Sequence, residues 1–117
     1  MNRGKGGGMS GILSLTIKDS SSLYSSYMPF ITGGGLFIPT AKQYRLGDEV
    51  FIRLTLMEEA DKIPVPGKVV WITPQGAQGN RTVGIGVQFT DATDTVRNRI
   101  EAYLVGILKS DRETSTL

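Results

Sequence analysis

Gly67-Lys68-Val69-Val70-Trp71-Ile72-Thr73-Pro74 and Gly84-Ile85-Gly86-Val87-Gln88-Phe89 are the two stretches that decide the fold of this chain. Both are rich in β-forming residues, and a segment rich in glycine, glutamine and asparagine separates them, so together they predict a β-hairpin. The glycines of the second stretch are spaced so that another backbone can approach closely. Neither stretch carries a catalytic group, which favours a small binding domain over an enzyme.

Alternating apolar residues predict further strands around this hairpin. We expect extended chain at Ile12–Ile17, Tyr27–Pro39 with an interruption at Gly33–Gly35, Val50–Met57, Ile63–Thr73 and Arg81–Thr90. Lys18–Ser26 is rich in serine and is predicted to be a loop.

Two of these strands allow a prediction of which face each side chain occupies. In the clearest strand, one face is expected to carry Val50, Ile52, Leu54 and Leu56. In the hairpin, Val69, Trp71 and Thr73 are expected on one face, opposite Val70 and Ile72.

The apolar period changes after Thr90. Helical spacing connects Val96, Ile100, Tyr103, Leu104, Ile107 and Leu108. Asp91–Asp94 supplies N-cap candidates, so we expect one helix of about four turns over Thr93–Lys109. Five or six short strands and one terminal helix describe an all-β barrel over residues 11–109, between a flexible glycine-rich arm at 1–10 and a polar tail at 110–117.

Composition excludes several function classes. The chain has 117 residues and no cysteine or histidine, so it lacks a thiolate nucleophile, the commonest general base and the commonest metal ligand. Carboxylates and lysines are the remaining candidates for catalysis, but no acid/base pair is evident. We therefore expect a protein that is not an enzyme and that uses no cofactor and no metal.

The charge distribution does not favour nucleic acid. The 13 basic residues include Arg3 and Lys5 of the arm, which leaves 11 to balance the 11 acidic residues of the body. Nucleic-acid binding normally needs a clustered basic excess. No apolar stretch approaches the length of about 20 residues that spans a bilayer, and no cleavable leader is evident, so we expect a cytoplasmic protein without membrane insertion.

Four segments, taken in order, resemble the PilZ domain family. They are Ile31–Ile38, Leu46–Val50, Gly67–Trp71 and Gly84–Phe89, and the resemblance extends over roughly residues 11 to 108. It implies a six-stranded β-barrel with one C-terminal α-helix. In most members of the family, it also implies a receptor for cyclic di-GMP.

The ligand-binding motifs of that family are degraded here. The family uses an Arg-x-x-x-Arg motif, but this chain has no arginine between Arg3 and Arg45. The second motif, Asp/Asn-x-Ser-x-x-Gly, aligns with Phe30–Gly35, where Thr32 replaces the serine, Phe30 replaces the polar group and Gly35 alone is intact. Guanidinium groups are suited to reading guanine and phosphate, so their loss predicts no cyclic di-GMP binding.

In its short length and its lack of the two arginines, the chain resembles the single-domain members of the family. Those members act in type IV pilus biogenesis and twitching motility without binding the nucleotide. That resemblance implies an adaptor that contacts the EAL domain of a FimX-type degenerate GGDEF-EAL receptor and the pilus extension ATPase PilB. The alternative is an atypical cyclic di-GMP sensor of the same family.

Apolar residues that replace the polar motifs are the candidate protein-binding residues, because tyrosine and tryptophan are frequent interface anchors. The candidates are Leu23, Tyr24, Tyr27, Met28, Phe30 and Trp71. A structural alternative stays open, since the first five can fill the end of the barrel that the nucleotide would occupy, and Trp71 can belong to the core.

Overall fold

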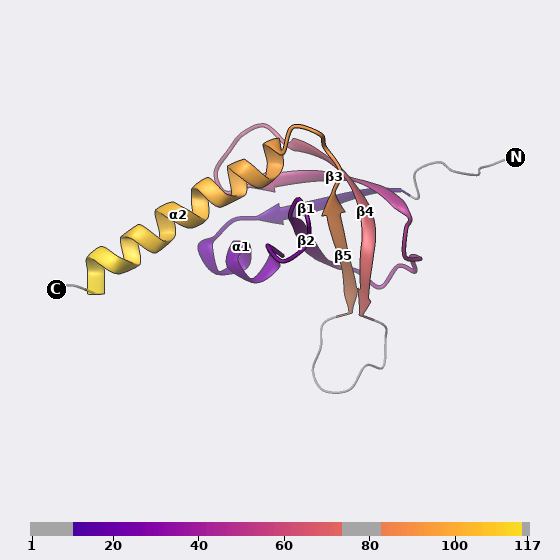
Figure 1. Cartoon of the computed structure of the whole chain (residues 1–117), viewed down its shortest axis with the longest axis horizontal. Coiled ribbons are helices and arrows are strands. Elements are labelled where there is room, and N and C mark those ends of the chain that lie inside the picture. Colours follow the sequence, from indigo (N-terminus) through magenta and orange to yellow (C-terminus); the bar gives the residue numbers. More distant parts are fainter. Residues whose placement is uncertain (1–10, 74–82, 116–117) are drawn as a thin grey trace, which may run out of the picture.

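The computed structural model describes residues 11–73 and 83–115, with side chains described as far as Gly106. The elements in chain order are β1 (Ile12–Ile17), α1 (Ser20–Ser26), β2 (Gly35–Pro39), β3 (Glu49–Leu56), β4 (Ile63–Thr73), β5 (Gly84–Phe89) and α2 (Thr95–Ser115). Figure 1 shows a strongly curved sheet, with α1 beside one end of it and α2 extending away from it.

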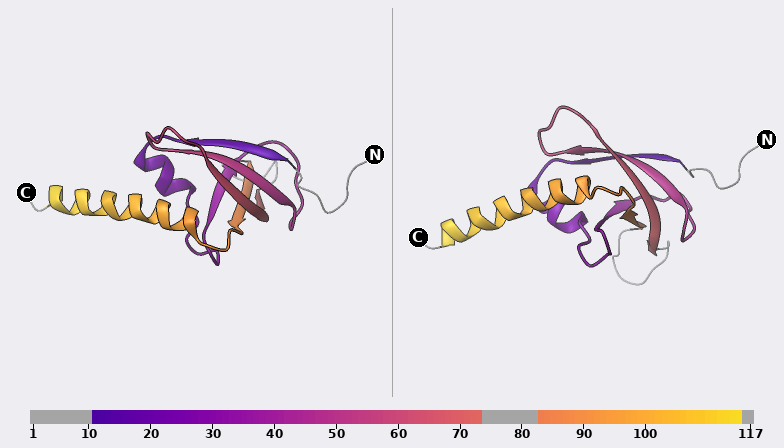
Figure 2. Two further views of the ribbon diagram at one scale, coloured as in Figure 1. Left: turned by 90° about the horizontal axis from the view of Figure 1, so that it is seen from above. Right: turned by 45° about the horizontal axis from the view of Figure 1, so that its top comes forward.

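The five strands form one sheet in the order β1-β3-β4-β5-β2. β1 is parallel to β3, and every other neighbouring pair is antiparallel. The two views of Figure 2 show the sheet curling into a half-barrel. The described residues contain five strands, not the six expected, and the predicted Tyr27–Pro39 strand is shorter, with Tyr27 joined to Leu36 only by an isolated bridge.

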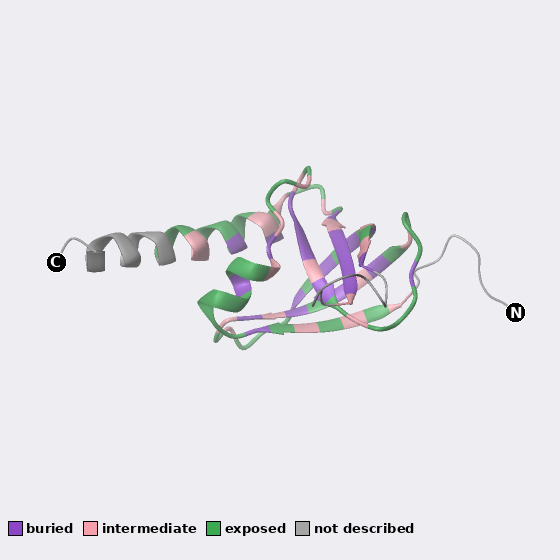
Figure 3. Cartoon of the chain, turned by 90° about the horizontal axis from the view of Figure 1, so that it is seen from below, coloured by how far each residue is buried: buried purple, intermediate pink, exposed green. Residues whose placement is uncertain are grey.

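β3 follows the predicted alternation. Val50, Ile52, Leu54 and Leu56 are each no more than 1% exposed, and they lie on the concave face that encloses the core. Ile85 and Val87 of β5 and Val96 and Ile100 of α2 belong to the same core, to which the other strands also contribute. Figure 3 shows the resulting alternation of buried and exposed positions along the strands.

The predicted loop at Lys18–Ser26 contains a helix, α1, so this prediction was wrong. Asp19 caps the helix, because its side chain accepts a hydrogen bond of 2.8 Å from the backbone N–H of Ser22. This bond lowers the pKa of the Asp19 carboxyl. Leu23 alone is buried, so the short helix has no apolar period that a sequence pattern can reveal.

α2 confirms the predicted terminal helix but has different bounds. It begins at Thr95 because Asp94 has a φ of 56°, and the Thr95 N–H donates to Asp91 Oδ2 at 2.9 Å. It runs to Ser115 instead of ending at Lys109. The segment after Lys109 is polar but contains no glycine or proline, so polarity alone was a poor guide to the end of the helix.

Candidate protein-binding surface

The outer face of β5 is lined by glycine, and side chains of the flanking strands cover it. Both Phe37 of β2 and Trp71 of β4 are paired in register with Gly86. A Cβ atom at Gly86 would lie 2.8 Å from Trp71 Cβ and 3.1 Å from Met28 Sδ, and one at Gly84 would lie 2.6 Å from Phe37 Cζ. Glycine is therefore what allows these three large side chains to lie over β5. We call Met28, Phe37 and Trp71 the aromatic surface.

A β-bulge places Trp71 on this surface. The register of β4 against β5 shifts between Val69 and Trp71, so Val70 is an extra residue. Val69 consequently faces the core at 1% exposure, whereas Trp71 faces outward at 48% exposure. The predicted grouping of Val69 with Trp71 on one face was wrong for this reason.

The polar end of Trp71 has a partner. Its indole Nε1 donates to Thr73 Oγ1 at 2.9 Å, and Thr73 itself is buried. An indole N–H that is already satisfied loses no hydrogen bond with water when a partner covers the ring. The ring can therefore serve as an apolar anchor.

The six predicted site residues separate into three pairs. Leu23 is fully buried and Tyr27 is 7% exposed, so both belong to the core, as the structural alternative proposed. Tyr24 and Phe30 are 69% and 78% exposed and do not fill the barrel end. Met28 is half-buried beside Trp71, and these two are the predicted residues that the structure brings together at Gly86.

Sequence reasoning did not include Phe37 among the site residues. Its signal was present, because Phe37 alternates with Leu36 and Ile38, which are both buried, and this alternation places Phe37 on the outer face. The importance of that position became visible only when β2 was paired with the glycines of β5.

The loop carrying the degraded motif is held by turn geometry. Gly33 and Gly34 have φ values of 80° and 84°, and the Gly34 N–H donates to the Ile31 carbonyl at 2.7 Å. A Cβ atom at Gly35 would lie 2.6 Å from the Val87 carbonyl oxygen, which explains why Gly35 is the intact residue of the motif.

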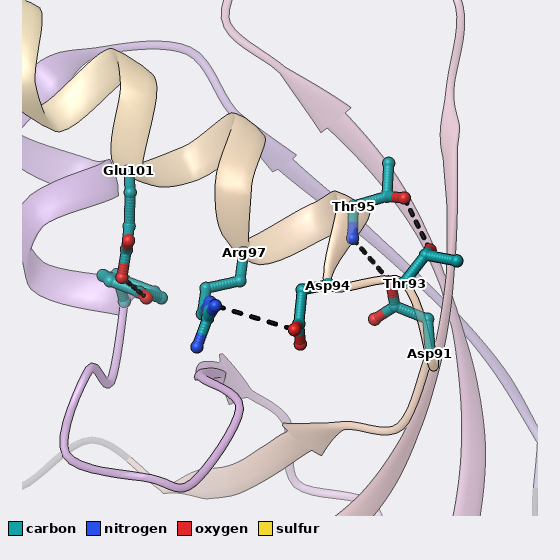
Figure 4. A network of polar contacts seen from close by, with 7 residues as sticks. Asp91, Thr93, Asp94, Thr95, Arg97 and Glu101 are labelled. Atoms are coloured by element: carbon teal, nitrogen blue, oxygen red, sulfur yellow. Dashed lines mark hydrogen bonds and ion pairs between the residues drawn. The ribbon is translucent and has the colours of Figure 1, made fainter.

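Two tyrosine–carboxylate contacts attach α2 to the rest of the domain. Tyr27 donates from its hydroxyl to Glu101 Oε2 at 2.6 Å, and burial together with this bond raises the pKa of Tyr27. Tyr103 donates to Glu59 Oε2 at 2.6 Å, and Arg99 pairs with the other oxygen of Glu59. Figure 4 shows Arg97 and Glu101 projecting from α2 on the side of the motif loop.

The described residues contain no metal-binding constellation, since no three potential carboxylate, histidine or cysteine ligands gather in one place. Neither of the two described helices is long and apolar enough to cross a lipid bilayer.

Comparison with known proteins supports the resemblance drawn from the sequence. The family model for the PilZ domain matches residues 12–106, a range that includes all five described strands and α2 as far as Gly106. A search of curated proteins found no match. The match covers most of the sequence, so the chain belongs to the PilZ domain family, a family of generally non-enzymatic adaptors and effectors in cyclic di-GMP signalling.

Proposed function

We propose that this chain is a non-enzymatic adaptor in type IV pilus biogenesis and twitching motility. In this proposal it contacts the EAL domain of a FimX-type receptor and the extension ATPase PilB, and it does not itself bind cyclic di-GMP. The observation that carries the adaptor role is the aromatic surface. There Trp71 lies over Gly86, and its side chain is nevertheless 48% exposed.

An exposed, preorganised aromatic cluster has the properties of an interface centre. Trp71 and Met28 are held in place over Gly86, so little side-chain entropy is lost when a partner covers them. Tryptophan is among the residues that most often carry binding energy, and methionine adapts to irregular partner surfaces. Tyr24 and Phe30 precede and follow Met28 in the chain, and both are exposed apolar side chains that a partner can contact.

The sequence of the motif region supports the absence of nucleotide binding. Removing a hydrogen bond to a charged partner costs about 1.5 to 3 kcal/mol, so two lost arginines lower affinity by roughly 10² to 10⁴. Phe30 also occupies the place of a polar ligand group and is 78% exposed.

The test is to titrate the EAL domain of a FimX-type protein and PilB separately against wild-type chain and against the Trp71→Ala, Tyr24→Ala and Phe30→Ala variants. Truncating a good anchor costs about 2 kcal/mol, so we expect at least one partner to bind Trp71→Ala about thirtyfold more weakly. The effect should change little with salt, because the anchor is uncharged.

Leu46→Ala is the matched control, because Leu46 is a large apolar side chain that is 66% exposed in the turn before β3 and is not part of the aromatic surface. It should bind both partners as wild type does. If Trp71→Ala, Tyr24→Ala and Phe30→Ala are all stable and bind both proteins with unchanged affinity, the proposal is contradicted.

An atypical cyclic di-GMP sensor is the second candidate, and one observation favours it. Arg97 packs against the motif loop, with its Cγ 3.1 Å from where a Cβ of Gly34 would lie. Its Nε is buried without a hydrogen-bond partner among the described residues, while one terminal nitrogen lies 3.6 Å from Asp94 Oδ2. Calorimetric titration with cyclic di-GMP decides between the candidates: micromolar or tighter binding that Arg97→Ala abolishes would establish the sensor.

A further inference from the structure

A second surface lies at the other end of the sheet order, on the outer face of β1, β3 and β4. It is a shallow groove of about 340 Å³ lined by Ile12, Phe51, Arg53, Lys62 and Pro64, together with Ile63, which is a buried core residue. We call it the basic groove. The strand register brings its residues together, because Ile12 is paired with Phe51 and Arg53 is paired with Pro64.

The floor of the basic groove is apolar. Ile12 is 65% exposed, Phe51 is half-buried beside it, and Pro64 is exposed across β3. Since the concave face of the same strands already supplies the core, these side chains are not needed to close the fold. These side chains therefore expose apolar area to water, and a bound segment would bury that area.

Two cations border this floor. Arg53 belongs to β3 and Lys62 immediately precedes β4, and both side chains are exposed. The ion pairs found among the described side chains join Arg97 to Asp94 and Arg99 to Glu59, so neither groove cation is paired with a described carboxylate. An apolar floor with unpaired positive charge at its border is complementary to an apolar side chain flanked by carboxylates.

Other occupants fit this charge pattern less well. Residues 1–10 of this chain contain Arg3 and Lys5 and no acidic residue, so their charge has the same sign as that of the groove. A second copy docked groove to groove would place like charges together. An anionic bilayer normally needs about four to eight clustered cations, whereas this groove offers Arg53 and Lys62, with Asp61 next to Lys62 in the chain.

We propose that the basic groove docks a short acidic segment of a protein partner, with one apolar side chain over Ile12 and Phe51 and carboxylates beside Arg53 and Lys62. This site is separate from the aromatic surface, and its test does not depend on the proposed pilus role. An adaptor with two such surfaces can hold two partners at once.

The test uses ¹⁵N-labelled full-length chain titrated with the peptide Glu-Glu-Leu-Phe-Glu-Glu, blocked at both ends. Amide resonances of the groove residues that have an N–H should shift with saturation, while those around Gly86 stay unchanged. A peptide with lysine in place of every glutamate should produce no saturable shift up to about 1 mM. Raising the salt to about 0.5 M should weaken the acidic peptide's binding.

Charge reversal identifies the cations involved. Arg53→Glu and Lys62→Glu should each weaken peptide binding about fivefold or more, since an attractive contact of up to about 1 kcal/mol becomes repulsive. Lys18→Glu is the matched control, because Lys18 is an exposed cation just after the opposite end of β1 and does not line the groove. Thermal melts confirm that each variant is folded.

Four results would overturn the proposal. They are the absence of saturable shifts, equal binding of the lysine peptide, groove shifts that depend on the concentration of the protein alone, and groove shifts caused by phosphatidylcholine vesicles with about 30% phosphatidylserine but not by the acidic peptide. The third result would indicate a second copy in the groove, and the fourth would indicate a membrane surface.

Discussion

β3 and β4 are neighbouring strands of one sheet, yet the apolar residues of β3 and those at the end of β4 face opposite sides of it. In β3 every second residue from Val50 to Leu56 is buried, and the pattern is unbroken. In β4 the same alternation stops at Val70, and Trp71, the largest side chain in the domain, is turned to the outer face. Regular alternation thus builds the core, whereas the β-bulge that interrupts it turns Trp71 toward the candidate interface.

Core and interface should therefore respond differently to truncation, and we expect the largest difference in stability between Leu54→Ala and Trp71→Ala. Leu54 is fully buried, so its loss leaves a cavity and should lower the free energy of unfolding by about 3 kcal/mol. Trp71→Ala should cost about 1 kcal/mol in stability, since the ring is already half exposed. Urea unfolding of both variants measures this difference, and equal destabilisation would mean that Trp71 is a core residue.

Gly86→Ala changes the outer face of the sheet alone. A methyl group at residue 86 would meet Trp71 Cβ at 2.8 Å, so the indole or the strand must move, at a cost of about 1 to 3 kcal/mol. Because Trp71 is the only tryptophan in the sequence, its fluorescence reports the movement directly. We expect altered emission and weaker partner binding.

Gly106→Ala is the control for that substitution, because no atom lies within 4 Å of a Cβ at Gly106. It should leave the emission of Trp71 unchanged. Wild-type emission in Gly86→Ala would show that the indole does not rest on the glycine.

The fold was largely predictable because its signals are local. Alternation in Val50–Met57 and helical spacing after Thr90 each reflect burial on one face, which the residue order records directly. α1 escaped prediction because a short capped helix buries only Leu23, and its serines otherwise resemble a loop.

The candidate site was less predictable, since it depends on which strands become neighbours. The bulge at Val70 reverses the facing of Trp71, and no residue type in that stretch marks the extra residue. Phe37 acquires its role only from its pairing with Gly86, about fifty positions away in the chain. Burial of Leu23 and Tyr27 likewise came from packing, which apolar composition alone does not distinguish from an exposed patch.

Tyr27 lies where core and polar surface meet, and it should give the smallest effect of the three. Tyr27→Phe keeps the buried ring but removes the hydrogen bond to Glu101. Because Glu101 is exposed and its carboxylate can bind water instead, we expect a loss of only about 1 kcal/mol in the free energy of unfolding at neutral pH. The pKa of folded Tyr27 is raised above the ordinary 10.0 by burial and by the bond to Glu101, with Arg97 acting in the opposite direction. A raised pKa means that the folded state favours the neutral hydroxyl, so this stabilisation is complete below pH 10.0 and decreases as the pH rises further.

The difference in unfolding free energy between wild type and Tyr27→Phe should thus shrink in alkali. Comparing the two proteins removes the contribution of other groups that titrate in both. A difference that stays constant from neutral to strongly alkaline pH would show that the hydroxyl of Tyr27 does not anchor α2 through Glu101.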